Sequence, residues 1–208
     1  EKTGGNVLKK TILVIDACVR REESRTKKLL EAALDTVRKE HPDWNLEILN
    51  LMDLDLMYWK TETLKERDEL LAKKEYDAPV FKYGNQFREA DGVIVAAPFW
   101  DLSIPAVLKV YIENISAEGI TFGCNESGLY GLCKAKWLLF LTTRGGIWAD
   151  SDMEQGSTYM EALCKFFGID EYACVYADGI DVQELDGEEI LREAIEETKG
   201  ICTRLSCE

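Results

Sequence analysis

The chain has 208 residues, 46% of them hydrophobic, and a formal net charge of -14 at pH 7. This length suits one α/β domain over residues 1–208, with enough apolar residues for a sizeable core. The acidic balance argues against nucleic acid, whose recognition depends on neutralising phosphates, and against anionic membranes, but it is compatible with a small anion held in a local basic pocket.

Seven cysteines are spread along the chain, an odd number without any C-x-x-C pair. Several fall in apolar segments, where buried free thiols are common, so each is interpreted first as a small core residue. We expect a reduced, cytoplasmic protein without a disulfide framework or zinc site. No apolar run approaches the ~20 residues of a membrane span, and the opening EKTGGNVLKK lacks the apolar region of a signal peptide.

Short apolar runs alternate with helical patterns along the chain. Strands are predicted at 11–17, 46–51, 92–99, 136–143 and 172–179. Helices are predicted at 25–40, 104–117, 156–168 and 185–204, and also within the charged segment 60–90, where YDAPVFKYGN interrupts them. Most strand runs are continuously apolar, as in strands covered on both faces. The alternation predicts a doubly wound α/β fold, a five-stranded parallel sheet with helices on both faces.

The loop after the first strand, DACVRREESRT, concentrates positive charge in an acidic chain. Five basic residues gather there: Arg20, Arg21, Arg25, Lys27 and Lys28. Three of them fall at or just inside a helix start, where the helix dipole already places partial positive charge. With the hydroxyls of Ser24 and Thr26 and the free backbone N–H groups, they would suit a bound phosphate. A solvated basic face, partly neutralised by Glu22 and Glu23, is the alternative.

Two other phosphate chemistries are disfavoured by the same loop. It lacks G-x-G-x-x-G, so the dinucleotide fingerprint of a Rossmann domain is absent. Cys18 raises the possibility of a thiol phosphatase, which needs a thiolate and an arginine in C-x5-R spacing. Arg25 comes one residue late for that ring.

The loops after the third and fourth strands carry further candidates. Ligands of doubly wound sheets bind beyond the carboxyl ends of the strands, where the strand order reverses. In APFWDLSIPAVLK, Phe99 and Trp100 would wall a planar ligand there, although packing under a loop is the commoner fate of such aromatics. In TTRGGIWAD, Gly145 and Gly146 let the backbone approach a ligand, unless they form a plain turn. The single histidine, His41, leaves little basis for a metal site.

Together the three loops resemble the FMN-dependent NAD(P)H quinone reductase and azoreductase family, of flavodoxin-like fold. Cys18, Ser24 and Thr26 keep the spacing of its serines after the first strand. AAPFWDLSIPAVLKVYIENI resembles its A-P-M-Y-N-F-S-I-P-A-x-L-K-x-W-I-D-x-I, and GITFGCNESGLYGLCKAKWLLFLTTRGG resembles its G-x-T-F-x-Y…G-P-x-G-L-L-x-G-K-K…S-R-G-G. The resemblance is densest at 11–30 and 91–148 and weak only at 40–90.

The resemblance implies which residues form the site. Those expected to bind FMN are Cys18, Ser24, Arg25 and Thr26 at its phosphate, Pro98, Phe99, Trp100, Asp101 and Leu102 along the isoalloxazine, and Thr143, Arg144, Gly145 and Gly146 at the other ring edge. Phe122 matches an aromatic near the substrate at a dimer interface, and Trp148 stands where members often have tyrosine or histidine. Cys18, Trp100 and Asp101 replace serine, tyrosine and asparagine, changes that bear on redox potential and substrate range.

The family activity implied is a two-step hydride transfer from NADH or NADPH through FMN to a quinone or azo compound, in a homodimer. No acid or base is required, so we predict no catalytic side chain beyond the cofactor site. Two other classes stay open. A flavodoxin-type electron carrier would use the acidity to dock onto basic partners. A binding module could keep the fold without the flavin, since fold alone does not fix activity.

Overall fold

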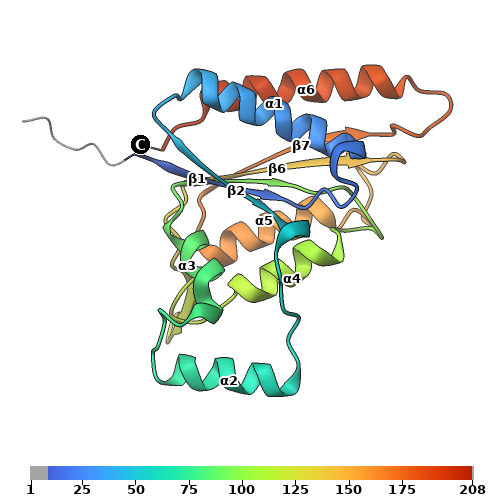
Figure 1. Ribbon diagram of the computed structural model, residues 1–208. Coiled ribbons are helices and arrows are strands. Elements are labelled where there is room, and N and C mark those ends of the chain that lie inside the picture. Colours follow the sequence, from blue (N-terminus) through green and yellow to red (C-terminus); the bar gives the residue numbers. More distant parts are fainter. Residues whose placement is uncertain (1–8, 208) are drawn as a thin grey trace, which may run out of the picture.

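A five-stranded parallel sheet forms the centre of the computed structural model, which describes residues 9–207 (Figure 1). The strands are β1 (Thr11–Asp16), β2 (Asn45–Asn50), β3 (Gly92–Ala96), β6 (Trp137–Arg144) and β7 (Glu171–Asp178). Their order is β2-β1-β3-β6-β7, and every neighbouring pair is parallel. The predicted fold class is confirmed, and each strand begins within one residue of its expected start.

Helices cover both faces of the sheet. Those that lie side by side on one face are α1 (Arg25–Glu40) and α6 (Gly187–Arg204). Those on the other face are α3 (Lys82–Glu89), α4 (Ala106–Ile115) and α5 (Gly156–Phe167). Helix α2 (Thr61–Ala72) stands apart from both layers at the bottom of Figure 1, and none of its residues is fully buried. Three short 3-10 turns complete the set: η1 (Arg21–Glu23), η2 (Leu51–Asp53) and η3 (Pro79–Phe81).

Side chains of the central strands alternate between two apolar cores. In β1, Ile12 and Val14 pack toward α1 and α6, whereas Leu13 and Ile15 pack toward α4 and α5. All four are at most 1% exposed. Burial of each such side chain contributes about 1.5–3 kcal/mol, which is why the central strands are continuously apolar in sequence.

The ends of α1 differ in their fit to the helix dipole. Arg38 and Lys39 lie in its last turn, where cations are favourable, but its first turn contains no acidic residue and starts with Arg25. Its apolar face, which includes Leu30 and Val37, is buried against the sheet. The stability of α1 therefore comes from packing, while its first turn keeps a positive charge that folding alone does not need.

Three expectations are corrected. A small antiparallel hairpin, β4 (Phe122–Asn125) and β5 (Gly128–Gly131), was not predicted, because its short glycine-rich strands lack a clear apolar alternation. The expected interruption at 76–85 is also shorter, because Pro79 opens η3 and the chain enters α3 directly at Lys82. Cys124, on the hairpin, is exposed rather than a core residue.

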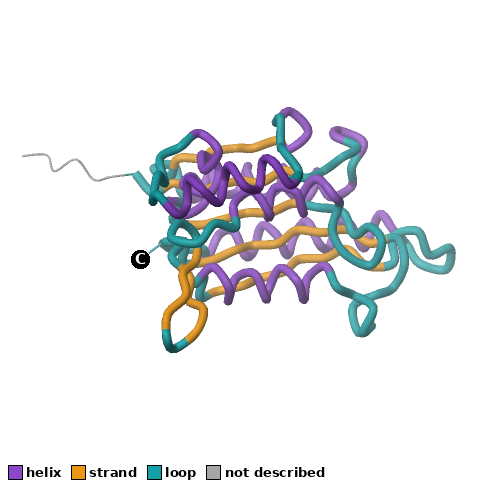
Figure 2. Tube along the Cα trace, turned by 90° about the horizontal axis from the view of Figure 1, so that it is seen from below, coloured by secondary structure: helices purple, strands orange, loops and turns teal. Residues whose placement is uncertain are grey.

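The two ends of the sheet differ, as the view from below in Figure 2 shows. Loops that follow the carboxyl ends of the strands gather at one end, and the hairpin lies near the opposite end. Because β1 pairs with both β2 and β3, the strand order reverses beside β1. Crevices form at such reversal points, so the loops after β1 and β3 are the first place to look for a ligand.

We predict that Gly131→Ala destabilises the protein by about 1–3 kcal/mol, because its Cβ would overlap the backbone of Phe167 and Gly168 at the end of α5. Urea unfolding would measure the change. Gly200→Ala in α6 is the control, because its Cβ would meet nothing nearer than Arg204 at 3.8 Å, and a helix interior favours alanine. Equal stability of wild type and Gly131→Ala would contradict the tight contact between hairpin and helix.

Candidate functional site

A cavity of about 270 Å³ opens at the carboxyl end of the sheet, beside the point where the strand order reverses. Four loops contribute to its wall, those after β1, β3, β6 and β7. The lining residues are Arg20, Glu23, Ser24, Arg25, Pro98, Phe99, Trp100, Thr143, Gly145 and Asp181. Seven of the fifteen residues expected from the sequence therefore share one cavity, and Arg20, Glu23 and Asp181 join them.

Hydrogen bonds extend the sheet ladder beyond the strands and set the position of Phe99. The Ala97 N–H donates to the carbonyl of Leu141 at 3.0 Å, and the Phe99 N–H donates to that of Thr143 at 3.1 Å. The loop after β3 is thereby held beside β6. This brings Phe99 and Thr143 to the same wall of the cavity.

The chain then reverses in a tight turn that contains strained backbone. The Trp100 N–H and the Ser103 N–H donate to each other's carbonyls, and the two central residues, Asp101 and Leu102, have φ of 49° and 67°. Aspartate tolerates this left-handed region, but leucine rarely enters it. Such strain persists where the surroundings enforce it, commonly at functional sites. The turn leaves Trp100 and Leu102 38% and 40% exposed, with Asp101 also facing solvent and outside the cavity lining.

The two hydroxyl side chains of the first loop, Ser24 and Thr26, differ in their contacts. Ser24 is the N-cap residue of α1 and lines the cavity, yet its side chain does not cap the helix. It lies within hydrogen-bond reach of the Cys18 thiol instead. Thr26 is fully buried, and its Oγ1 lies 2.7 Å from that of Thr143. Thr26 therefore ties α1 to β6, and its hydroxyl is already engaged.

The thiol of Cys18 is poorly suited to nucleophilic chemistry. Cys18 is 2% exposed, and burial, followed by the charge of nearby Asp16, raises its pKa well above the ordinary value. A thiol phosphatase needs the opposite shift. Asp16 itself accepts from the Cys18 N–H at 2.9 Å and from Lys27 Nζ at 2.5 Å, which holds the loop after β1 against α1.

Three of the five basic residues at the start of α1 form ion pairs with carboxylates from other parts of the chain. Arg21 pairs with Asp53 at 2.7 Å, and Lys27 pairs with the buried Asp16. Arg25 forms two hydrogen bonds with Asp181, at 2.6 and 2.9 Å. Within residues 9–207, Arg20 and Lys28 form no ion pair. Of the five cations, only Arg20 and Arg25 line the cavity.

Arg144 lies behind the cavity rather than in its lining. It is 1% exposed, and its guanidinium lies 3.3 Å from Glu154 and 3.6 Å from Asp178. The charged group also faces the rings of Phe99 and Tyr176, at 5.6 and 4.5 Å from their centroids. It supports the wall that carries Phe99 through a cation–π contact.

The two carboxylates beside Arg144 hold the loop that joins β6 to α5. Asp178 accepts from the N–H groups of Trp148 and Ala149 at 2.8 and 3.0 Å. Glu154 accepts from the first two N–H groups of α5, those of Gly156 and Ser157, each at 2.9 Å. A buried charge is tolerated only with such partners, so this cluster is built to fix the loop.

The glycine pair and the tryptophan that follow Arg144 complete the rim. A Cβ at Gly145 would lie 2.6 Å from Asp181 Oδ2, and one at Gly146 would lie 2.9 Å from Trp148 Nε1. The Trp148 ring packs against Phe99 with centroids 5.6 Å apart. A larger residue at either position would therefore force the Asp181 or Trp148 side chain to move, and Trp148 flanks the aromatic wall.

Phe122 does not share this cavity within one chain. It lies on the hairpin, with its ring 4.5 Å from that of Phe166 near the end of α5. Gly156, which begins α5, lies beside Phe99. Ten helical residues separate the two ends, about 15 Å at 1.5 Å per residue. Phe122 and the cavity are thus at opposite ends of α5.

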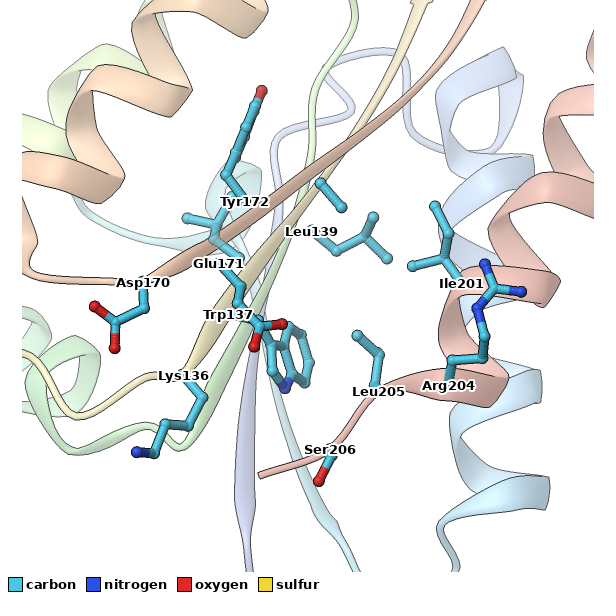
Figure 3. A pocket seen from close by; sticks show the side chains of 12 residues that line it. Lys136, Trp137, Leu139, Asp170, Glu171, Tyr172, Ile201, Arg204, Leu205 and Ser206 are labelled. Carbon is cyan, nitrogen blue, oxygen red and sulfur yellow. The ribbon is translucent and has the colours of Figure 1, made fainter. Parts of the chain in front are cut away.

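A larger cavity, of about 480 Å³, lies at the amino ends of β6 and β7 (Figure 3). The indole of Trp137 and the side chains of Leu205 and Ile201 surround it, with charges of both signs, Glu171 and Arg204, at its margins. It lies at the end of the sheet where ligands of doubly wound folds do not usually bind. The smaller cavity is therefore the candidate site.

Comparisons with known proteins identify the family of this chain. Residues 10–201 match a family model described as flavodoxin-like fold. The chain belongs to this flavodoxin-like family. It is 34% identical over 192 residues to the FMN-dependent NADH:quinone oxidoreductase of Clostridium beijerinckii, covering 90% of this chain and 96% of the relative. A second such enzyme, from Clostridium acetobutylicum, is 35% identical over 85% of this chain and 89% of its own.

A solved azoreductase of Bacillus anthracis superposes with a TM-score of 0.86 at 28% identity, over 94% of this chain and all of that one. This flavodoxin-like chain thus shares its fold with that azoreductase over 94% of its length. Within residues 9–207, no helix is long and apolar enough to cross a membrane.

Several residues of this flavodoxin-like site were not anticipated from the sequence. Asp181 and Asp178 come after or at the end of β7, and Glu154 lies before α5. Asp181 pairs with Arg25, 156 residues away, and Asp178 pairs with Arg144 on the neighbouring strand, so local sequence does not mark them, whereas the partners of Glu154 lie within the same segment. An acidic residue directly after a predicted strand is the one available signal, and it is weak.

We predict that Glu154→Ala lowers the free energy of unfolding by about 3–5 kcal/mol, because it leaves the buried Arg144 short of a counter-ion and uncaps α5. Thermal or urea unfolding would measure this. Asp152→Ala is the matched control, since Asp152 is an exposed acid in the same loop. A loss no greater than that of Asp152→Ala would show that the buried pair is not needed for stability.

Proposed function

We propose that this chain is an FMN-dependent NADH:quinone oxidoreductase that also reduces azo compounds. The observation that carries the proposal is the cavity itself, which sets two arginines and a helix N-terminus beside an aromatic wall. Relatives 34–35% identical over most of their length carry that quinone reductase name, and a structural neighbour is an azoreductase.

The donor set at one end fits a phosphate monoester. Arg25 begins α1, so its guanidinium and the unpaired N–H groups of the first helical turn point to the same region. Arg20 adds a second positive charge without an ion-pair partner among the described residues. Ser24, whose side chain leaves the helix uncapped, offers a hydroxyl. We infer that these groups hold the FMN phosphate.

The other end fits a flat ring. Phe99 and Trp100 line the cavity with aromatic rings, and the strained turn after them leaves Leu102 exposed. Gly145 lets the opposite wall approach closely, because any Cβ there would collide with Asp181. We infer that the isoalloxazine lies between these walls, with Pro98 and Thr143 beside it. Asp101, being exposed, would act on the ring only through solvent, where its charge is strongly screened.

The chemistry that bound FMN supplies is acceptance of a hydride from NADH and its delivery to the quinone or azo acceptor. The chain's own contribution is placement and exclusion of water. Arg144, Glu154 and Asp178 keep the loop after β6 in place, so that the aromatic wall is set before ligands arrive. Such preorganisation contributes by holding reactants in a reactive geometry. We favour NADH over NADPH as donor, because the relatives are named for it.

We also propose that the working unit is a homodimer. The cavity of one chain, about 270 Å³, is slightly below the usual ~300–1,000 Å³ of ligand sites, so one chain encloses only part of a flavin nucleotide. Apolar side chains stand exposed in the loops after β3 and β6, including Trp100, Ile147 and Met153. Phe122, remote from its own cavity, would then contact substrate only in the partner's site.

The cysteine pattern supports a cytoplasmic location for this enzyme. No disulfide links the seven cysteines, and most lie in apolar surroundings. Burial raises the pKa of Cys133, Cys164, Cys174 and Cys202 to about 12, so these thiols are protonated and unreactive at neutral pH. Such free thiols are usual in reducing compartments.

We predict that FMN stabilises the purified apoprotein, by about 2.7 kcal/mol at a hundredfold excess over Kd, or about 5–10 °C in Tm. The holoprotein should show visible flavin absorption that NADH bleaches without oxygen and a quinone restores. Bleaching with no acceptor turnover would favour an electron carrier. A colourless protein whose Tm ignores FMN would contradict the proposed function.

We predict that sedimentation at micromolar concentration gives twice the mass of one chain. Ile147→Glu, in the loop after β6, should shift the protein toward monomer because it places a charge in an apolar interface. Ile48→Glu is the control, since Ile48 is similarly exposed on the edge strand β2. A monomeric wild type would contradict the dimer and the role of Phe122.

A further inference from the structure

The guanidinium of Arg25 is held by a carboxylate of the same chain. Nη1 and Nη2 donate to the two oxygens of Asp181 at 2.6 and 2.9 Å, a two-pronged pairing. Asp181 comes from the loop after β7, and Arg25 is the first residue of α1. The Asp181 N–H donates to the Gly145 carbonyl at 2.9 Å, so this loop is pinned to the cavity wall.

A carboxylate bound in this way uses the same donors that a phosphate would use. Arginine recognises both anions through a planar pair of N–H groups. Asp181 also lines the cavity, so its negative charge lies at the end proposed for the phosphate. Its hydrogen bonds with Arg25 hold the pKa of Asp181 below its usual range, and the carboxylate is therefore charged at neutral pH.

We infer that Asp181 is a built-in competitor of the cofactor phosphate for Arg25, an inference that rests on the proposed function. FMN must displace Asp181 from the guanidinium or share the guanidinium with it against a like charge. In either case Asp181 weakens FMN binding, and it does so through the phosphate alone. Arg20 also lines the cavity and acts on Asp181 through its charge, but it forms no ion pair with Asp181 within residues 9–207, and it would provide the first contact for the incoming phosphate.

The expected change in FMN affinity follows from how exposed the Arg25 and Asp181 side chains are. The side chains of Arg25 and Asp181 are 39% and 61% exposed, so solvent screens their attraction. Exposed pairs are weak, and a phosphate can therefore displace the carboxylate. We expect removal of the carboxylate charge to tighten FMN binding by about three- to tenfold rather than by orders of magnitude.

The test is a titration of apoprotein with FMN and, in parallel, with riboflavin, which lacks the phosphate. Asp181→Asn should lower the Kd for FMN about three- to tenfold and leave that for riboflavin unchanged. Glu184→Gln is the matched control, because it removes the same charge from an exposed position in the same loop and should change neither Kd. Asp181→Ser also removes the carboxylate and provides a second test of the same effect.

A double-mutant cycle shows whether Arg25 carries the competition. Arg25→Ala should weaken FMN binding by at least about tenfold, since hydrogen bonds to charged groups are worth that much. In the Arg25→Ala background, Asp181→Asn should give a smaller gain than in wild type, because the shared partner is gone.

Three results would overturn the inference. They are an FMN Kd unchanged or raised in both Asp181 variants, an equal tightening for riboflavin, and a full gain from Asp181→Asn without Arg25. Failure of wild type to bind FMN at all would overturn the proposed function as well. Normal FMN binding by wild type with unaltered Asp181 variants would overturn this inference alone.

Discussion

All five strands of the central sheet run parallel, so every carboxyl end reaches the same edge. The hydrogen-bond ladder continues past that edge, from Ala97 to Leu141 and from Phe99 to Thr143, and it ties the loop after β3 to β6. The register of the ladder decides which residues meet. The reversal of strand order beside β1 then leaves room for a cavity where these loops diverge.

Although the chain is acidic overall, its basic side chains near the cavity form local ion pairs. Three of the cations at the start of α1 pair with Asp16 at the end of β1, Asp53 in η2 and Asp181 in the loop after β7. Behind the cavity, Arg144 is buried against two carboxylates that also accept backbone N–H groups. The Arg25–Asp181 pair is exposed enough for a ligand to exchange its partners, whereas the buried Asp16 and the Arg144 cluster are costly to disturb.

Strain and buried charge meet at the same end of the molecule. Gly145 lines the cavity, the left-handed turn at Asp101 and Leu102 follows its lining residue Trp100, and the buried Arg144 lies behind its wall. The remaining elements follow ordinary rules of propensity and packing. Local departures of this kind are expected at a working site, because function there competes with stability.

The sequence by itself determined the fold class, because continuous apolar runs separated by helical patterns permit few arrangements other than a parallel sheet covered on both faces. It also predicted that Ser24, Arg25, Phe99, Trp100 and Gly145 would gather, since loops after parallel strands share an edge. Only the tertiary structure decided that Thr26 bonds to Thr143, that Arg144 lies behind the wall, that Phe122 lies far from its own cavity, and that Asp181 reaches Arg25. These contacts join residues distant in sequence, and side-chain direction at a strand end depends on neighbours that no local pattern encodes.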